Sequence, residues 1–235
     1  MTKHLSESQI IPYLQGLATQ GNEVTLLSFE ERLADADLER FETGRVAKLL
    51  SDSKIRWKWL RYHKRPSLPA TGYDVFLGTI YSVYLIVRHR INVVHSRGYV
   101  PLPIALVCKL FCRTKLVFDV RGLMAEEYVD AGHWKQGSLP YRATKWFERL
   151  AFRHADAVIV LTHRVAEILR SIPSLRKTPV YVIPCCVNVE SYPIGTDRLA
   201  LRKELGVVGS PVLAYVGSLG TWYMGREMVK RTTKV

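Results

Sequence analysis

The chain has 235 residues, of which 48% are hydrophobic and 23% are charged, as in ordinary globular proteins and unlike disordered ones. Lysine and arginine outnumber the acidic residues by 34 to 21. The resulting net charge of +13 favours anionic partners, namely phosphorylated ligands, nucleic acid or an acidic membrane face. The sequence shows no apolar signal segment and no unbroken run of about 18 apolar residues, so we expect neither a secretory leader nor a membrane-spanning helix.

The expected location is the cytoplasm, and a peripheral position at the inner membrane face stays open. Cys108 and Cys112 are one helical turn apart, and Cys185 and Cys186 are adjacent. Neither pair has histidines at the spacing of a zinc site. We therefore expect reduced thiols that pack as small buried hydrophobic side chains, and no metal or cofactor.

The N-terminal elements are a helix followed by a strand. Apolar side chains recur at helical spacing within residues 6–20, and Gly21 suits the position just past a helix end. Residues 23–29 read as a strand. A helix before the first strand is unusual in a fold that alternates strands and helices. We therefore expect one strand position of the sheet, the first, to be empty.

A basic, helix-prone stretch follows over residues 31–64 and ends in a segment where tryptophans alternate with cations. The segment contains Lys54, Arg56, Trp57, Lys58, Trp59 and Arg61. Alternation with a period of two is typical of a strand, whose tryptophans would pack inward. Tryptophans between cations also suit an anionic membrane surface, and both interpretations stay open.

Strands and helices alternate through the rest of the chain. We predict strands at residues 73–77, 92–95, 115–120, 157–161, 179–183 and 212–216, and helices at 80–90, 101–111, 139–154, 164–171 and 199–205. Two of these strands are apolar on both faces, which indicates a parallel sheet between two layers of helices. The predicted fold class is therefore α/β, with a Rossmann-like parallel sheet and helices on both faces.

Four stretches together resemble glycosyltransferases of family 4, which have the two-lobed GT-B fold. They are residues 6–27, the strand ends Asn92-Val-Val-His-Ser-Arg-Gly and Lys115-Leu-Val-Phe-Asp-Val-Arg-Gly, the unit Phe152-Arg-His-Ala-Asp-Ala-Val-Ile-Val-Leu-Thr, and Val182-Ile-Pro-Cys-Cys-Val-Asn-Val-Glu-Ser-Tyr. The resemblance implies an acceptor-side lobe at residues 1–187 without its first strand. It also implies a linker at 188–210 and the start of a truncated nucleotide-sugar-binding lobe at 211–235.

The resemblance implies transfer of a sugar, with retention of its anomeric configuration, from a nucleotide-activated donor. The acceptor would be a glycan or a lipid-linked molecule, as in the synthesis of cell-envelope polysaccharide, and neither a metal nor nucleic acid is implied. Because donor binding belongs mostly to the second lobe of the family, we expect a fragment that is inactive by itself. The alternative is a non-catalytic lobe that binds an acceptor or a membrane.

The resemblance also places the candidate site residues. The candidate catalytic residues, at strand ends beside the cleft, are His95, Asp119 and Arg121. A guanidinium suits a phosphate and a carboxylate can orient it, although a structural ion pair is the open alternative. The candidate acceptor-binding residues are Arg97, Glu126, Glu127, His133 and Trp134, for which ordinary structural roles also stay open. The donor-phosphate loop would comprise Gly217, Ser218, Gly220 and Arg226, without two cations that are usual in the family.

Overall fold

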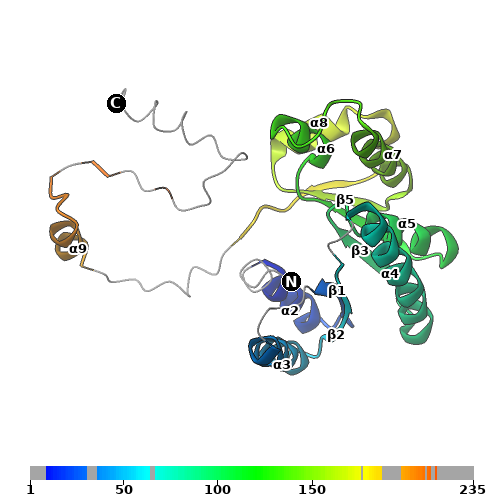
Figure 1. The fold of residues 1–235 in the computed structure, drawn as a ribbon, viewed down its shortest axis with the longest axis horizontal. Coiled ribbons are helices and arrows are strands. Elements are labelled where there is room, and N and C mark those ends of the chain that lie inside the picture. The colour runs from blue at the N-terminus through cyan, green and yellow to red at the C-terminus, as the bar shows by residue number, and fades with distance from the viewer. Residues whose placement is uncertain are drawn as a thin grey trace.

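The computed structural model describes residues 9–30, 36–63, 67–175, 177–186, 197–209, 211, 212 and 215 (Figure 1). Its strands are β1 (Thr25–Glu30), β2 (Arg56–Arg61), β3 (Val93–Arg97), β4 (Lys115–Val120), β5 (Ala157–Val160) and β6 (Val180–Val182). Its helices are α2 (Ile11–Thr19), α3 (Ala36–Asp52), α4 (Ser67–His89), α5 (Leu102–Phe111), α6 (Met124–Asp130), α7 (Leu139–His154), α8 (His163–Arg170) and α9 (Arg198–Glu204).

All described strand pairings are parallel, but the strands form two sheets. A two-stranded sheet contains β1 and β2, and a four-stranded sheet has the order β3-β4-β5-β6. Parallel neighbours need a crossover between them, and helices such as α3, α5 and α7 supply it. The predicted fold class, a parallel sheet flanked by helices, is confirmed, and the break in the sheet falls between β1 and β3.

The four-stranded sheet carries the larger hydrophobic core. Phe118 of β4 and Phe152 of α7 are almost fully buried, and their ring centroids lie 5.9 Å apart. Around them pack apolar side chains of α5, β5 and α8, including Leu102, Val158 and Leu169. The central strands β4 and β5 are mostly buried along their lengths, as parallel strands covered by helices are, which explains the continuous apolar sequence of β5.

The two-stranded sheet has a much smaller core. Its buried hydrophobic residues are Ile11 of α2, Leu50 of α3 and Ile55 just before β2. A side-chain hydrogen bond links the two strands, from Trp57 Nε1 to Ser28 Oγ at 2.9 Å. Figure 1 shows α2 and α3 gathered around these strands, away from α6, α7 and α8.

One long helix, α4, replaces the predicted strand at residues 73–77 and the predicted helix at 80–90. The prediction of a strand was wrong because a short apolar run does not distinguish a strand from a helix that is partly buried. Gly78 lies where α4 meets β1, since a Cβ at this position would stand 2.6 Å from Phe29 Cζ and 2.7 Å from Ile104 Cδ1.

The helix α4 also corrects the expectation that no helix of this chain is able to span a membrane. Within the described residues, Pro69–His89 is long and apolar enough to cross a bilayer by length and composition, and 28% of its most apolar window is buried. Length and composition are weak evidence for a span. We treat α4 as a surface helix because its other face packs in the core, where Ile86 is buried against Ile104 and Cys108.

Two further differences concern the segments that follow strands. Residues after Arg121, where the sequence predicted no helix, form the short helix α6, which has Glu126 and Glu127 in its first turn. Most of the predicted strand at 212–216 lies outside the described residues, and Val212 and Tyr215 are described as non-strand and exposed. Thr162 caps α8 as a helix start requires, because its Oγ1 accepts a hydrogen bond from the Val165 amide at 3.2 Å.

Candidate functional site

Four charged or titratable candidates meet at the carboxyl ends of β3 and β4. Asp119 Oδ2 lies 3.3 Å from Arg97 Nη1, 3.6 Å from His95 Nε2 and 3.8 Å from Arg121 Nη1. The parallel register explains the meeting, because Arg97 of β3 stands directly beside Asp119 of β4. In open parallel sheets, ligands bind at the carboxyl ends of the strands. The structure therefore brings the predicted catalytic residues together where a site is expected.

The carboxylate of Asp119 is the central group of this cluster. The residue is 3% exposed, and its Oδ1 atom has no hydrogen-bond partner among the described residues. Burying a carboxylate is costly unless charges or hydrogen bonds compensate. The two guanidinium groups compensate at Oδ2, whereas Oδ1 is a buried acceptor without a partner among the described residues.

Two residues that sequence reasoning did not select complete the cluster. Gln9 Oε1, just before α2, accepts hydrogen bonds from Arg121 Nη2 at 3.0 Å and Arg97 Nη2 at 3.2 Å. Cys185, just after β6, places its Sγ 3.0 Å from Arg121 Nη2. The position of Cys185 at a strand end was a usable signal, whereas nothing in the sequence marks Gln9.

The prediction that all four cysteines are small buried side chains is wrong for two of them. Cys108 is buried, and burial raises the pKa of its thiol to about 11. Cys112 is half-buried, but Cys185 and Cys186 are exposed. The pattern Ile-Pro-Cys-Cys places the last two just past the end of β6, in a stretch that is neither helix nor strand.

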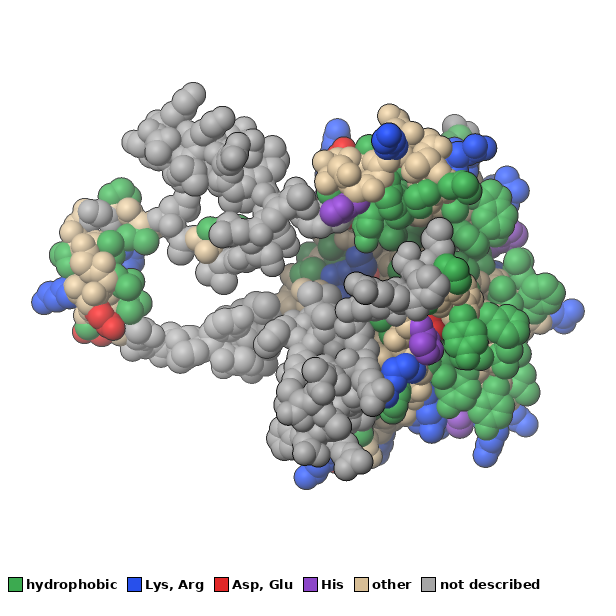
Figure 2. All heavy atoms as spheres, viewed as in Figure 1, with side chains coloured by type: hydrophobic (Ala, Val, Ile, Leu, Met, Phe, Trp, Pro, Cys, Tyr) green, Lys and Arg blue, Asp and Glu red, His purple; other side chains and the backbone are tan. Residues whose placement is uncertain are grey.

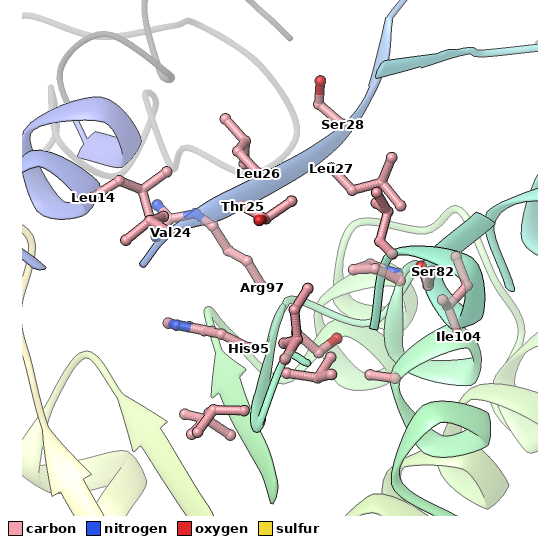
Figure 3. Close-up of a pocket in the computed structure, with 18 of the residues that line it drawn as sticks. Leu14, Val24, Thr25, Leu26, Leu27, Ser28, Ser82, His95, Arg97 and Ile104 are labelled. Carbon is pink, nitrogen blue, oxygen red and sulfur yellow. The ribbon is translucent and has the colours of Figure 1, made fainter. Parts of the chain in front are cut away.

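The surroundings of the cluster are partly buried and strongly charged. The Tyr13 and His95 rings meet edge to face with centroids 5.9 Å apart. The pKa of Tyr13 is raised, first by burial and then by the negative charge of Asp119. The pKa of Arg97 is lowered, first by burial and then by the neighbouring Arg121, while Asp119 opposes both effects. Figure 3 shows the Arg97 side chain extending from β3 toward the segment that contains Val24, so it lies across the space between the two sheets.

The candidate acceptor-binding residues on and after α6 form a separate group. Glu126 Oε1 pairs with Lys145 Nζ at 2.8 Å, and Lys145 also pairs with the buried Glu148 of α7. Trp134 packs on Tyr128 with ring centroids 4.5 Å apart, and the corresponding distance from Tyr128 to His133 is 5.8 Å. These contacts favour the structural interpretation of Glu126 and Trp134.

Glu127 belongs to the same segment but is exposed. A Cβ on Gly122 would lie 2.1 Å from Glu127 Oε1, so a side chain at this position would have to displace the flexible end of Glu127. Binding of an acceptor by Glu126, Glu127, His133 or Trp134 stays a prediction.

The basic aromatic segment forms the strand β2 and its flanks. Lys54, Arg56, Lys58 and Trp59 are exposed, whereas Trp57 is half-buried against Ser28. Arg56 Nη2 pairs with Glu23 Oε2 at 2.6 Å, and the Arg61 guanidinium lies 5.5 Å from the centroid of the Trp59 ring. The strand interpretation is confirmed, with only Trp57 turned inward, and a role at a membrane surface stays a prediction.

The predicted donor-phosphate loop, Gly217, Ser218, Gly220 and Arg226, lies outside the described residues. In the part of the chain that the structure describes, no three His, Cys, Asp or Glu side chains gather as potential metal ligands.

The model of Glycosyltransferase Family 4 matches residues 7–191, and the chain belongs to this family. Two solved plant structures match the chain weakly. Glycyrrhiza uralensis UGT73P12, complexed with glycyrrhetinic acid 3-O-monoglucuronide, is 11% identical with a TM-score of 0.47 over 74% of this chain and 45% of that one. Arabidopsis thaliana UGT89C1, complexed with quercetin, is 12% identical with a TM-score of 0.48 over 83% of this chain and 50% of that one. The chain thus spans about half the length of these structures. No curated protein matches the sequence.

Proposed function

We propose that this chain is the acceptor-side lobe of a retaining glycosyltransferase that uses a nucleotide-activated sugar donor. Membership of Glycosyltransferase Family 4 supports sugar transfer in general. The observation that carries the assignment of the site is the buried Asp119 carboxylate, held by Arg97 and Arg121 at the carboxyl ends of two parallel strands.

In the proposed reaction, the bond between the anomeric carbon and the donor diphosphate breaks while an acceptor hydroxyl oxygen bonds to the same face of that carbon. The diphosphate leaves with the electron pair, and the hydroxyl proton passes to a leaving phosphate oxygen, so no protein nucleophile is needed. Arg97 and Arg121 stabilise negative charge on the diphosphate. Asp119 Oδ2 holds the two guanidinium groups in place, and the more accessible His95, 3.6 Å from the same oxygen, accepts a hydrogen bond from the acceptor hydroxyl and orients it.

The proposed division of labour places donor binding on a second lobe, so we expect the 235 residues alone to transfer no sugar. The test compares this chain with the same chain fused to the donor-side lobe of another member of the family, each incubated with UDP-glucose or GDP-mannose and a panel of glycan and lipid-linked acceptors. Product from the fusion alone supports the proposal. Turnover by the unfused chain contradicts it, and so does a folded fusion that shows no transfer.

Variants of the active fusion test the site itself. We expect Arg121→Gln to lower kcat/KM by about 100-fold, the usual loss when one donor to a developing negative charge is removed. Asp156→Asn is the matched control, because Asp156 also pairs with two cations, Lys109 and Lys115. It lies just before β5, at the end of the strands opposite to the candidate site. Equal losses in both variants would show that the first change merely weakens the fold.

A second candidate function, peripheral binding to the cytoplasmic face of an anionic membrane, is favoured by an exposed apolar face of α4. Large side chains follow one another at helical spacing along this face: Tyr73, Phe76, Ile80, Tyr84 and Val87. Phe76 is 62% exposed and Val87 is 72% exposed. Figure 2 shows hydrophobic side chains gathered on the part of the surface where Figure 1 places α4.

Basic residues stand at one end of this apolar face. Arg88 lies in the last turn of α4 and Arg90 follows it, and Arg113 lies just after Phe111, which ends α5 and is 80% exposed. An apolar face with cations at its border is the arrangement that inserts between lipid headgroups and attracts anionic lipids. Lipid-linked acceptors would then meet the lobe at the membrane surface.

Co-sedimentation with vesicles distinguishes the apolar face of α4 from the basic aromatic segment of β2 as the surface that binds a membrane. We expect the chain to bind vesicles of phosphatidylcholine with phosphatidylglycerol, and Phe76→Asp to abolish this binding while Trp59→Asp on β2 preserves it. Both positions are exposed, so each change leaves the core intact. Equal recovery with vesicles of phosphatidylcholine alone, or loss of binding only in Trp59→Asp, would overturn the assignment to α4.

A further inference from the structure

Two adjacent thiols lie just past the carboxyl end of β6, and their surroundings differ. Cys185 and Cys186 are both exposed, in a stretch that is neither helix nor strand. The Cys185 Sγ atom accepts a hydrogen bond from Arg121 Nη2 at 3.0 Å. The Cys186 thiol instead donates to the Pro184 carbonyl oxygen, with Sγ and O 3.4 Å apart. One sulfur therefore faces a positive charge, and the other faces the negative end of a carbonyl dipole.

The positive charge around Cys185 comes from two guanidinium groups. Arg121 contacts the sulfur directly, and Gln9 Oε1, 3.8 Å from the sulfur, accepts hydrogen bonds from both Arg121 and Arg97. Burial and then Arg121 lower the pKa of Arg97. Negative charge on Asp119, and then on Cys185, opposes that lowering. Because Coulomb attraction is mutual, two guanidinium groups against a single carboxylate favour negative charge on the Cys185 sulfur.

The other two cysteines of the chain lack this environment. Cys108 is buried, and burial raises the pKa of its thiol to about 11. Cys112 is half-buried and packs against the hydrophobic cluster of α4 and α5. The thiolate is the form of cysteine that attacks an oxidant, and reactive cysteines are exposed and close to cations. Of the four cysteines, Cys185 alone combines exposure with a contact to a guanidinium group.

We propose that Cys185 is a site of reversible oxidation by peroxides and that Cys186 resolves the oxidised form. In the first step, the Cys185 sulfur attacks a peroxide oxygen, the O–O bond breaks, and hydroxide or an alkoxide leaves, so that a sulfenic acid forms. In the second step, the Cys186 sulfur attacks the Cys185 sulfur, and the sulfenic oxygen leaves as water with the thiol proton. The two cysteines lose two electrons in total, and the peroxide gains them.

The adjacency of the two cysteines makes the oxidation reversible. Neighbouring Cα atoms lie about 3.8 Å apart across a trans peptide bond, whereas disulfides usually join Cα atoms about 4.4–6.8 Å apart. A disulfide between neighbours is therefore strained, and strained disulfides are more easily reduced. Oxidation also removes from Arg121 a sulfur that carries negative charge. The effect of this loss on sugar transfer rests on the proposed function, whereas the modification itself does not.

The first experiment compares the two sulfurs in the 235-residue protein. Cys186→Ser and Cys185→Ser are a matched pair, because each keeps one of two adjacent, exposed thiols. Each variant is treated with hydrogen peroxide and dimedone, which traps sulfenic acids, and mass spectrometry of its peptides locates the label. We expect Cys185 to be labelled at least about tenfold faster than Cys186, as one hydrogen bond to a charged group allows. Equal rates, or faster labelling of Cys186, would contradict the proposal.

The second experiment tests the guanidinium group. In the Cys186→Ser protein, we expect Arg121→Gln to slow labelling of Cys185 by about tenfold, because the charged donor to the sulfur is lost. The control is Arg170→Gln, which removes a guanidinium that contacts β6 at the Val180 carbonyl. Circular dichroism verifies that both variants are folded. An unchanged rate in Arg121→Gln, or an equal loss in the control, would show that Arg121 does not activate the sulfur.

The third experiment follows the unaltered chain without a trapping reagent. We expect peroxide to remove two hydrogens from the peptide that contains Cys185 and Cys186, and dithiothreitol to restore them. A sulfenic acid that persists, or a disulfide between two chains, would overturn the role of Cys186. None of these readouts depends on sugar transfer, so failure of this proposal and failure of the proposed function are distinguishable.

Discussion

The two sheets of this lobe are built from the same kind of parallel strand, but they differ in how completely they are enclosed. In the four-stranded sheet, β4 and β5 pair on both edges and are packed between helices, and Phe118, Val120, Val158 and Val160 are essentially inaccessible. In the two-stranded sheet, each strand pairs with a single partner among the described strands, and Ser28 is the one residue of β1 that is buried. A parallel sheet is stable when both faces and most edges are covered, and a pair of strands alone does not achieve this.

The polar contacts show the same contrast. Around the larger sheet, the buried Glu148 accepts a hydrogen bond from Tyr99 at 2.8 Å and pairs with Lys145. The pKa of Tyr99 is raised, first by burial and then by the charge of Glu148. In the smaller sheet, the ion pair of Arg56 with Glu23 is exposed and contributes little. We therefore expect the β1–β2 unit to open before the rest of the lobe, and the following experiments test this difference.

The largest effect is expected in the larger core. Phe118→Ala removes a fully buried ring that contacts Phe152 and Tyr99, so the free energy of unfolding should fall by about 3–5 kcal/mol. Urea denaturation measures this change. The matched variant Ile55→Ala, in the smaller core, should lower the free energy of global unfolding by less, because local opening already exposes that core. Equal losses would show that the two sheets unfold together.

Asp156 links three segments of the larger sheet and gives the lobe a dependence on pH. Its Oδ2 accepts from Lys109 at 2.6 Å and from the Leu116 amide at 2.7 Å, and its Oδ1 lies 3.2 Å from Lys115. Burial raises the pKa of Asp156, but these three hydrogen bonds together outweigh burial and lower the pKa below its ordinary value.

A lowered folded-state pKa means that Asp156 stabilises the protein above the pKa of the unfolded chain, about 4, and that this contribution is lost as pH falls through the folded-state value. Asp156→Asn should therefore cost about 1–3 kcal/mol at pH 7 and progressively less in acid. Urea denaturation at several pH values measures the difference. A cost that does not change with pH would contradict the proposed role of the charge.

A smaller effect is expected where α4 joins the two sheets. Gly78→Leu places a side chain where Phe29 and Ile104 now meet, so β1 should be displaced from α4. We expect amide exchange in β1 and β2 to become faster while exchange in β4 and β5 is unchanged. The control Gly72→Leu, also on α4, adds its side chain where a Cβ would meet nothing within 4 Å.

The smallest effect is expected at the hydrogen bond between Trp57 and Ser28, which links the strands of the two-stranded sheet. Trp57→Phe keeps an aromatic ring but removes the donor to Ser28 Oγ, which should cost about 0.5–1.5 kcal/mol. Because this loss falls within the unit that opens first, it should appear in the local exchange of β1 and β2 and not in the global urea midpoint. A shift of the midpoint comparable to that of Phe118→Ala would contradict the ranking.

The sequence by itself determined the parallel α/β class and most element positions. Strands such as Ala157–Val160 are continuously apolar, and helices such as Leu139–His154 show helical periodicity, so local pattern and burial agree there. The sequence also predicted that His95, Asp119 and Arg121 lie at the carboxyl ends of the strands. Neighbouring parallel strands end on the same side of the sheet, so residues near those ends come together.

Only the tertiary structure decided what depends on contacts between distant segments. The run at 73–77 is part of the helix α4, and α4 packs at Gly78 on Phe29 of β1 and Ile104 of α5, which lie far away in the sequence. Gln9 and Cys185 join the site through hydrogen bonds and contacts that no local pattern encodes. The sequence predicted an empty strand position, but the place of the division between β1 and β3 depends on which strand edges meet, and hydrophobic periodicity carries information about the faces of a strand but none about its partner across an edge.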